Sequence, residues 1–153
     1  MSGTRDAFVR RTSLGTLGLV LVVAGCGGGG RLTRSEFDAK ANAICSRYTT
    51  KINAVPAPKT INDVPAYVGL VKPYIERGVD ELASLKPPTR LQAEYDRWMS
   101  TQREAITQTD ELRRAAERND LRGANRVIRM LRERNKRGNA HAAKLGADVC
   151  AKS

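Results

Sequence analysis

The chain has 153 residues and is strongly basic, with 27 Lys and Arg against 16 Asp and Glu and a formal net charge of +11. Its length is that of one domain, and the low aromatic content of 5% disfavours a β-sandwich. Three cysteines and one histidine leave almost no ligands for a metal centre or a catalytic cluster. We therefore expect a protein that is not an enzyme and holds no cofactor or metal.

Residues 1–25 have the form of an export signal. Arginines precede an uncharged apolar run over 13–24, and small residues follow it. The run is too short for a membrane-spanning helix, which takes about 20 residues. The block Val23-Ala24-Gly25-Cys26 resembles the lipobox of bacterial lipoproteins. That resemblance implies cleavage before Cys26 and attachment of a diacylglycerol to its thiol.

The lipobox interpretation places the protein on the extracytoplasmic face of the cell membrane, because acyl chains would hold it there. The segment 26–34 then serves as an acylated, Gly-rich tether to a domain over 35–153. One alternative is an ordinary secretory signal in which Cys26 stands by chance. The pair Arg10-Arg11 also leaves the twin-arginine export route open, although Ser13 stands where that route usually has a large apolar residue.

Two cysteines remain after Cys26, one near each end of the mature chain. Export would place Cys45 and Cys150 in an oxidising compartment, where an even pair indicates a disulfide. Closing a loop of about 100 residues would stabilise the fold by roughly 4–5 kcal/mol. A catalytic dithiol normally has the pattern Cys-x-x-Cys, which is absent. The alternative is two unpaired buried thiols.

Four stretches of the mature chain carry apolar residues at helical spacing. We predict Ser35 as the cap of the first helix, Thr89 as the cap of the third and Asp120 as the cap of the fourth. Prolines separate the first three stretches, and Gly146 is predicted to end the fourth. The predicted inward positions are Phe37, Ala41, Ile44, Tyr48, Ile52 and Val55; Val64, Val68, Val71, Ile75, Gly78, Leu82 and Leu85; Leu91, Tyr95, Trp98, Gln102, Ala105, Thr109, Leu112 and Ala116; and Leu121, Ala124, Ile128, Leu131, Asn135, Gly138, Ala142 and Leu145.

This pattern predicts an all-α fold. Spacings of three and four residues are typical of left-handed bundle packing, and short loops favour antiparallel neighbours. We predict an antiparallel up-down four-helix bundle with left-handed packing, stapled by one disulfide. In that order the first and last helices lie side by side, where a bridge between Cys45 and Cys150 would have to lie.

Several short motifs together resemble a known group of proteins. They are Ser35-Glu-Phe37, Ala41-Asn-Ala-Ile-Cys45, Leu82-x-x-Leu-x-Pro-Pro88 and Leu145-Gly-x-x-x-Cys150. With the lipobox, they are similar to an uncharacterised family of small lipoproteins from high-GC Gram-positive bacteria, over most of residues 26–150. The resemblance implies a lipid-anchored helical domain with the same two cysteines, and it implies no activity.

The predicted seam of the bundle is not purely apolar, since polar or small residues occupy five inward positions. These are Gly78, Gln102, Thr109, Asn135 and Gly138. One interpretation is a cleft for a small ligand, which would make the protein a carrier or sensor. The other is a marginal, small-residue core. We favour the second, because a weak core fits the need for a disulfide.

Positive charge is concentrated in one stretch, since residues 113–137 hold ten Arg and Lys against three acids. On the fourth helix a basic face is predicted, made of Arg122, Arg126, Arg129, Arg132 and Lys136. Arginine forks suit carboxylates and phosphates, so this face could bind anionic lipid, a wall polymer or an acidic protein. A merely solvated face is the alternative. We do not expect nucleic acid, because export removes that partner and no aromatics interleave with the arginines.

No catalytic motif emerges from the remaining residues. His141 is the only histidine, and no partner nucleophile is identifiable for it, so we expect a packed or edge residue rather than a general base. The patterns HExxH and GxSxG and the phosphate-binding P-loop are absent. The sequence therefore predicts a lipid-anchored binding or interaction module.

Overall fold

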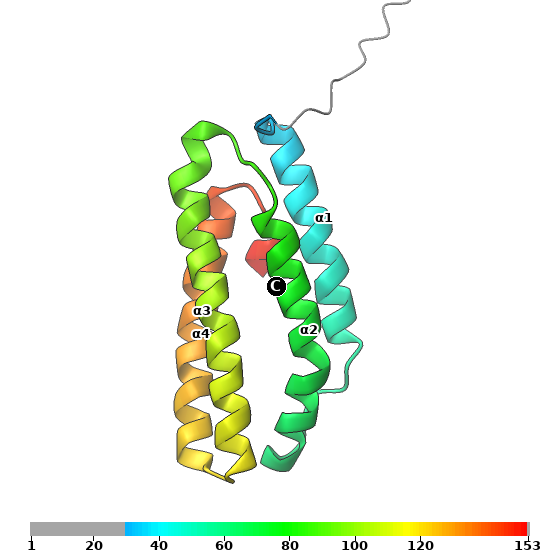
Figure 1. Ribbon diagram of the computed structural model, residues 1–153, viewed down its shortest axis with the longest axis vertical. Helices are drawn as coiled ribbons and strands as arrows, with labels where there is room; N and C mark the ends of the chain where they lie inside the picture. The colour runs from blue at the N-terminus through cyan, green and yellow to red at the C-terminus, as the bar shows by residue number, and fades with distance from the viewer. Residues whose placement is uncertain (1–29, 153) are drawn as a thin grey trace, which may run out of the picture.

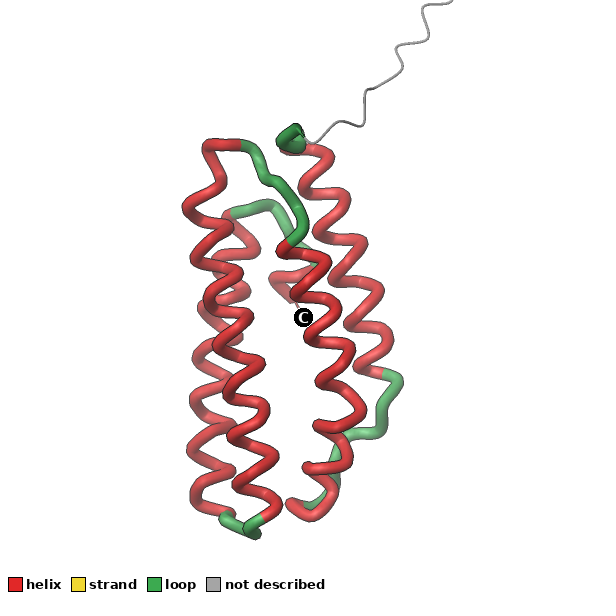
Figure 2. The backbone as a smooth tube through the Cα atoms, in the orientation of Figure 1, coloured by secondary structure: helices red, strands yellow, loops and turns green. Residues whose placement is uncertain are grey.

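The computed structural model describes residues 30–152, so the predicted signal peptide over 1–25, Cys26 and the first tether residues lie outside the described residues. The described part forms α1 (Arg34–Asn53), α2 (Val64–Ala83), α3 (Gln92–Glu117) and α4 (Leu121–Lys144), with 3-10 turns η1 (Ile61–Asp63), η2 (Thr89–Leu91) and η3 (Cys150–Lys152). Successive long helices run in opposite directions (Figure 1), and their connections lie near the ends of the bundle (Figure 2). The predicted all-α four-helix bundle is confirmed.

The helix boundaries agree with the prediction for α4 and differ for α1. Asp120 caps α4 by accepting a hydrogen bond of 2.8 Å from the backbone N–H of Gly123. The cap of α1 is Thr33, not Ser35. Thr33 Oγ1 accepts from the N–H of Glu36, and the Glu36 carboxylate accepts from the N–H of Thr33 at 2.8 Å. This reciprocal pair satisfies two N–H groups, whereas Asp38, three residues after Ser35, is engaged by Arg34 at 2.9 Å.

The prediction that Thr89 caps α3 is wrong. The chain enters α3 through η2, in which the N–H of Leu91 donates to the carbonyl of Pro88 at 2.8 Å and the N–H of Gln92 donates to the carbonyl of Thr89. These backbone bonds serve the start of the helix, so no side chain caps it.

Part of the predicted tether belongs to the bundle. The N–H of Leu32 donates to the carbonyl of Lys86 at 2.8 Å, and Arg31 Nη1 donates to the carbonyl of Pro87 at 2.9 Å. The Leu32 side chain packs against the hydrophobic core. The domain therefore begins by residue 31 rather than at 35, because the loop between α2 and α3 binds this segment.

The disulfide between Cys45 and Cys150 is confirmed, with a Cα–Cα distance of 5.2 Å. It joins α1 to η3, beyond the end of α4, and α1 and α4 meet through η3 instead of lying side by side as predicted. The chain leaves α4 at Gly146, whose φ of 76° favours glycine, and returns as η3, which packs on both α4 and α1. Figure 1 shows this C-terminal turn, in red, between the two helix pairs. Direct packing joins α1 to α2, α2 to α3 and α3 to α4.

The main hydrophobic core occupies one end of the bundle. Trp98 is 1% exposed, and Phe37 and Leu145 are fully buried. The cluster draws on the start of α1, the end of α2, the start of α3 and the end of α4, together with η3; its members are Phe37, Ala41, Ile44, Tyr48, Leu82, Tyr95, Trp98, Met99, Ala142, Leu145, Ala147 and Cys150. We call this half of the bundle the disulfide end. The opposite half contains the α3–α4 turn and lies outside this core cluster.

Candidate functional site

An elongated groove runs along the inside of the bundle and has a volume of about 500 Å³. All four helices contribute to its walls, and its aliphatic lining includes Ile52, Val64, Val68, Val71, Ile75, Leu112, Ile128 and Leu131. The sequence pattern predicted these residues as core. Val68 and Val71 are buried, but Ile52, Ile75 and Leu131 are only half-buried. The prediction is wrong for Leu121, which is 57% exposed at the start of α4, and for Asn135, which is also exposed. The other predicted inward residues are at least partly buried, but at this end they do not close into a core.

The groove follows from the way in which the C-terminal turn joins the bundle. Around the four helices, α1 and α4 meet through η3 instead of packing directly along their length. Cys150 of η3 and Cys45 of α1 line the groove at the disulfide end. Away from that end the turn no longer fills the space, so we infer that the groove opens between α1 and α4.

All three polar seam residues line this groove, namely Gln102, Thr109 and Asn135. The Thr109 hydroxyl donates to the carbonyl of Ala105 at 2.9 Å, so its own helix satisfies it. Within residues 30–152 the side-chain amides of Gln102 and Asn135 form no hydrogen bond. The Trp98 indole also lines the groove, and its buried Nε1 has no partner in the same part of the chain. A mostly apolar wall with a few polar groups is typical of ligand sites.

Of the two inward glycines, Gly78 also lines the groove, and both are closely packed. A Cβ at Gly78 would lie 3.1 Å from the ring of Tyr48, and a Cβ at Gly138 would lie 3.1 Å from Nε2 of Gln102. The Tyr48 ring is held in place because its hydroxyl donates to Glu81 Oε1 at 2.5 Å, a contact that raises the pKa of Tyr48. Close packing thus requires a small residue at both positions, and only Gly138 lies outside the groove lining.

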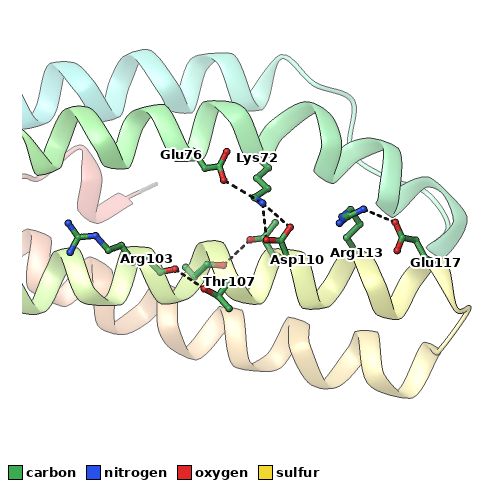
Figure 3. A network of polar contacts seen from close by, with 9 residues as sticks. Lys72, Glu76, Arg103, Thr107, Asp110, Arg113 and Glu117 are labelled. Atoms are coloured by element: carbon green, nitrogen blue, oxygen red, sulfur yellow. Dashed lines mark hydrogen bonds and ion pairs between the residues drawn. The ribbon is translucent and has the colours of Figure 1, made fainter.

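On the other side of the groove, a polar contact holds α2 against α3. Lys72 Nζ lies 2.8 Å from Asp110 Oδ2 and 3.4 Å from Glu76 Oε1. Figure 3 shows Lys72 reaching across from α2 to Asp110 on α3. The hydrogen bond to Asp110 raises the pKa of Lys72. This contact and the buried Val68 and Val71 close the α2–α3 side, which leaves the α1–α4 side as the opening.

His141 lies near the disulfide end in a charged cluster on α3 and α4. Its Nδ1 is 2.8 Å from Glu94 Oε1, and Lys144 and Arg97 lie within 3.3 Å and 3.1 Å of the same carboxylate. The hydrogen bond from His141, with those from Lys144 and Arg97, lowers the pKa of Glu94 from its ordinary 4.5 to about 2. The histidine thus joins two helices, in keeping with a packed or edge residue.

This cluster predicts an acid-sensitive contribution to stability. Because the pKa of Glu94 is lower in the folded than in the unfolded state, its contribution is fully present above pH 4.5 and is lost as the pH falls toward 2. Glu94→Gln should remove on the order of 1–2 kcal/mol at neutral pH, since water partly screens the cluster. Thermal unfolding between pH 2 and 7 tests this, with exposed Glu133→Gln as the control. If the stability of Glu94→Gln falls between pH 4.5 and 2 as steeply as that of the native protein, the prediction is wrong.

All five residues of the predicted basic face are exposed: Arg122, Arg126, Arg129, Arg132 and Lys136. Within residues 30–152 none of them forms an ion pair. Elsewhere in the basic stretch, Arg113 pairs with Glu117 at 2.8 Å, and Arg134 pairs with Glu104 of α3. The basic face is therefore a free cationic surface on α4.

The described residues hold no group of three or more His, Cys, Asp or Glu placed to bind a metal ion. None of the helices between residues 30 and 152 is long and apolar enough to cross a membrane. No protein-family model, no curated protein and no solved structure matches the chain. The site therefore has to be interpreted from its own geometry.

Sequence reasoning did not single out the aliphatic lining of the groove as functional. Hydrophobic periodicity identifies the side of a helix that faces inward, but a closed core and an open groove have the same periodicity. The available signal was the position of the polar seam residues, because Gln102, Thr109 and Asn135 all line the groove.

Proposed function

We propose that the protein is a lipid-anchored, non-enzymatic protein of the cell envelope that carries or senses a small apolar ligand. The export-signal pattern over 1–25 and the block ending in Cys26 support the anchor and the extracytoplasmic location. The groove supports the binding activity. Of the two functions that the sequence left open, a carrier and a docking module, the carrier is the one that this geometry favours.

The observation that carries the proposal is the half-buried aliphatic lining of a groove of about 500 Å³. Leaving such side chains partly in water forgoes roughly 25 cal/mol for each Å² of apolar surface. A ligand that covers Ile52, Ile75 and Leu131 would recover this free energy. The free amides of Gln102 and Asn135 would orient its polar atoms.

Binding is tested with a neutral apolar fluorophore, N-phenyl-1-naphthylamine, whose emission rises in apolar surroundings. We expect the chain to bind it, and Ala105→Phe to weaken binding at least tenfold, because Ala105 lines the groove. The matched control is Ala93→Phe on the exposed face of α3. Equal binding by both variants, or no binding by the native chain, would refute the proposal.

The lipid anchor is tested separately by labelling cells with a radioactive fatty acid. Cys26→Ala should lose the label and accumulate at the unprocessed size. The Cys45→Ala/Cys150→Ala variant, which removes the other two cysteines, should keep the label. A Cys26→Ala protein that still carries the label would show that Cys26 is not the attachment site.

A second candidate function is docking on an anionic surface, which the exposure of the whole basic face favours. Replacing Arg122, Arg126, Arg129 and Arg132 by glutamine should weaken salt-sensitive binding to vesicles that contain an acidic phospholipid. Equal binding of native and substituted proteins would indicate that the face is only solvated.

A further inference from the structure

The groove and part of the basic face lie next to each other on α4. Ile128, Leu131 and Asn135 line the groove. At 3.6 residues per turn, Arg132 lies about 40° around the helix from Ile128 and about 60° from Asn135. Lys136 follows Arg132 by four residues and lies about 60° from Asn139, which also lines the groove. Arg132 and Lys136, both exposed, therefore lie along the edge of the groove that α4 forms.

The surroundings of this edge carry little negative charge. The only acid on α4 is Glu133, which lies about 100° beyond Arg132, on the side away from the groove. The lining stretch of α1, residues 44–53, has no acid and contains Lys51 and Arg47, the latter paired with Glu81 of α2 at 3.0 Å. Arg132 and Lys136 form no ion pair within residues 30–152. The opening is thus apolar inside and positively charged at its α4 edge.

We propose that the ligand of this groove is a single molecule of an acyl-chain lipid with an acidic head group. This inference rests on the proposed binding function and names the chemistry of the ligand. The acyl chain of the lipid lies along the aliphatic lining of the groove. On α2 this lining extends from Val64 to Leu82, a length of about 27 Å. The carboxylate or phosphate of the head group binds Arg132 and Lys136, which supply charge-assisted hydrogen bonds.

The charge at the edge distinguishes this ligand from other apolar molecules. A neutral lipid or a hydrophobic peptide would fill the groove and leave both cations unused. A bilayer surface would engage Arg122 and Arg126 as readily as Arg132 and Lys136, because all four are exposed. A lipid seated in the groove depends on Arg132 and Lys136 alone.

The test is displacement of N-phenyl-1-naphthylamine from the full chain by laurate and by dodecanol, which share the same twelve-carbon chain. At slightly alkaline pH, laurate should displace the probe at about a tenfold lower concentration than dodecanol, a preference expected for hydrogen bonds to a charged group. Added salt should reduce that preference. Equal displacement by the two compounds would overturn the acidic-lipid proposal and leave the groove intact, whereas failure to bind the probe would overturn the proposed function itself.

Paired variants assign the charge preference to particular residues. Arg132→Gln/Lys136→Gln should reduce the preference for laurate to less than twofold without changing thermal stability, because both residues are exposed. Arg122→Gln/Arg126→Gln, on the same helix and of the same charge, should keep it. If the second pair removes the preference equally, the cations act as a general anionic surface and the proposal is wrong.

Two other occupants are distinguished by the same probe. If the chain's own apolar segment over 13–24 fills the groove, the probe will bind only after Val20→Asp/Val22→Asp. If a second copy fills it, probe binding will fall as the protein concentration rises and sedimentation will show a dimer. Either result would overturn the lipid proposal.

Discussion

The Cys45→Ala/Cys150→Ala variant should lose about 4–5 kcal/mol of its free energy of unfolding. The two cysteines are 105 residues apart, so the bridge restricts nearly the whole unfolded domain. It also ties η3 to α1, which Asn42 holds in addition through hydrogen bonds to the backbone of Gly146 and Val149. Urea unfolding followed by circular dichroism measures the loss.

The native protein treated with a reductant is the matched control for that variant, since it breaks the same bond and keeps both sulfur atoms. The two samples should unfold at similar urea concentrations. A loss below about 1 kcal/mol would mean that the core at the disulfide end holds α1 without the bridge, in contrast to the expectation for a long closed loop.

Two leucines predicted on the same face of the fourth helix, Leu131 and Leu145, should lose very different amounts of stability when replaced by alanine. Leu145→Ala should cost about 3–5 kcal/mol, because Leu145 is fully buried and the substitution leaves a cavity. Leu131→Ala should cost about 1 kcal/mol, because Leu131 is half-buried in the wall of the groove and loses less contact.

The comparison is direct because the substitution is the same and the residues lie about four helical turns apart. Urea unfolding of both variants provides the measurement. Equal losses would mean that the end of the bundle around Leu131 is as tightly packed in solution as the disulfide end. Leu131→Ala should in addition change the affinity for the apolar fluorophore, whereas Leu145→Ala should change it only through stability.

Much of the fold could be predicted from the sequence, because it depends on local and periodic signals. Short-range or compositional signals specify the four apolar stretches, the Asp120 cap, the end of α4 at Gly146 and the disulfide. The predictions for Ser35 and Thr89 were wrong because a neighbour decided each outcome. Glu36 completes a capping box with Thr33, and the η2 turn supplies the backbone bonds at the start of α3.

The candidate site could be predicted only in part. The sequence predicts Gln102, Thr109 and Asn135 as inward residues and favours a weak core over a cleft, whereas the structure places them in the lining of the groove. The openness of the groove depends on η3 lying between α1 and α4, and no periodicity in the helices specifies where the last turn docks. The exposure of the basic face was predictable, but its proximity to the groove required the arrangement of all four helices.

The concentration of the core at the disulfide end also has a consequence for dynamics. Helices separate locally at a free energy set by the apolar contacts broken, so the end of the bundle away from the disulfide should open at a lower free energy than the whole domain. Amide hydrogens around Leu112 and Ile128 should then exchange faster than those around Trp98 and Leu145. Such local opening would let ligands of different width enter the groove. A bound ligand would slow amide hydrogen exchange at that end of the bundle alone.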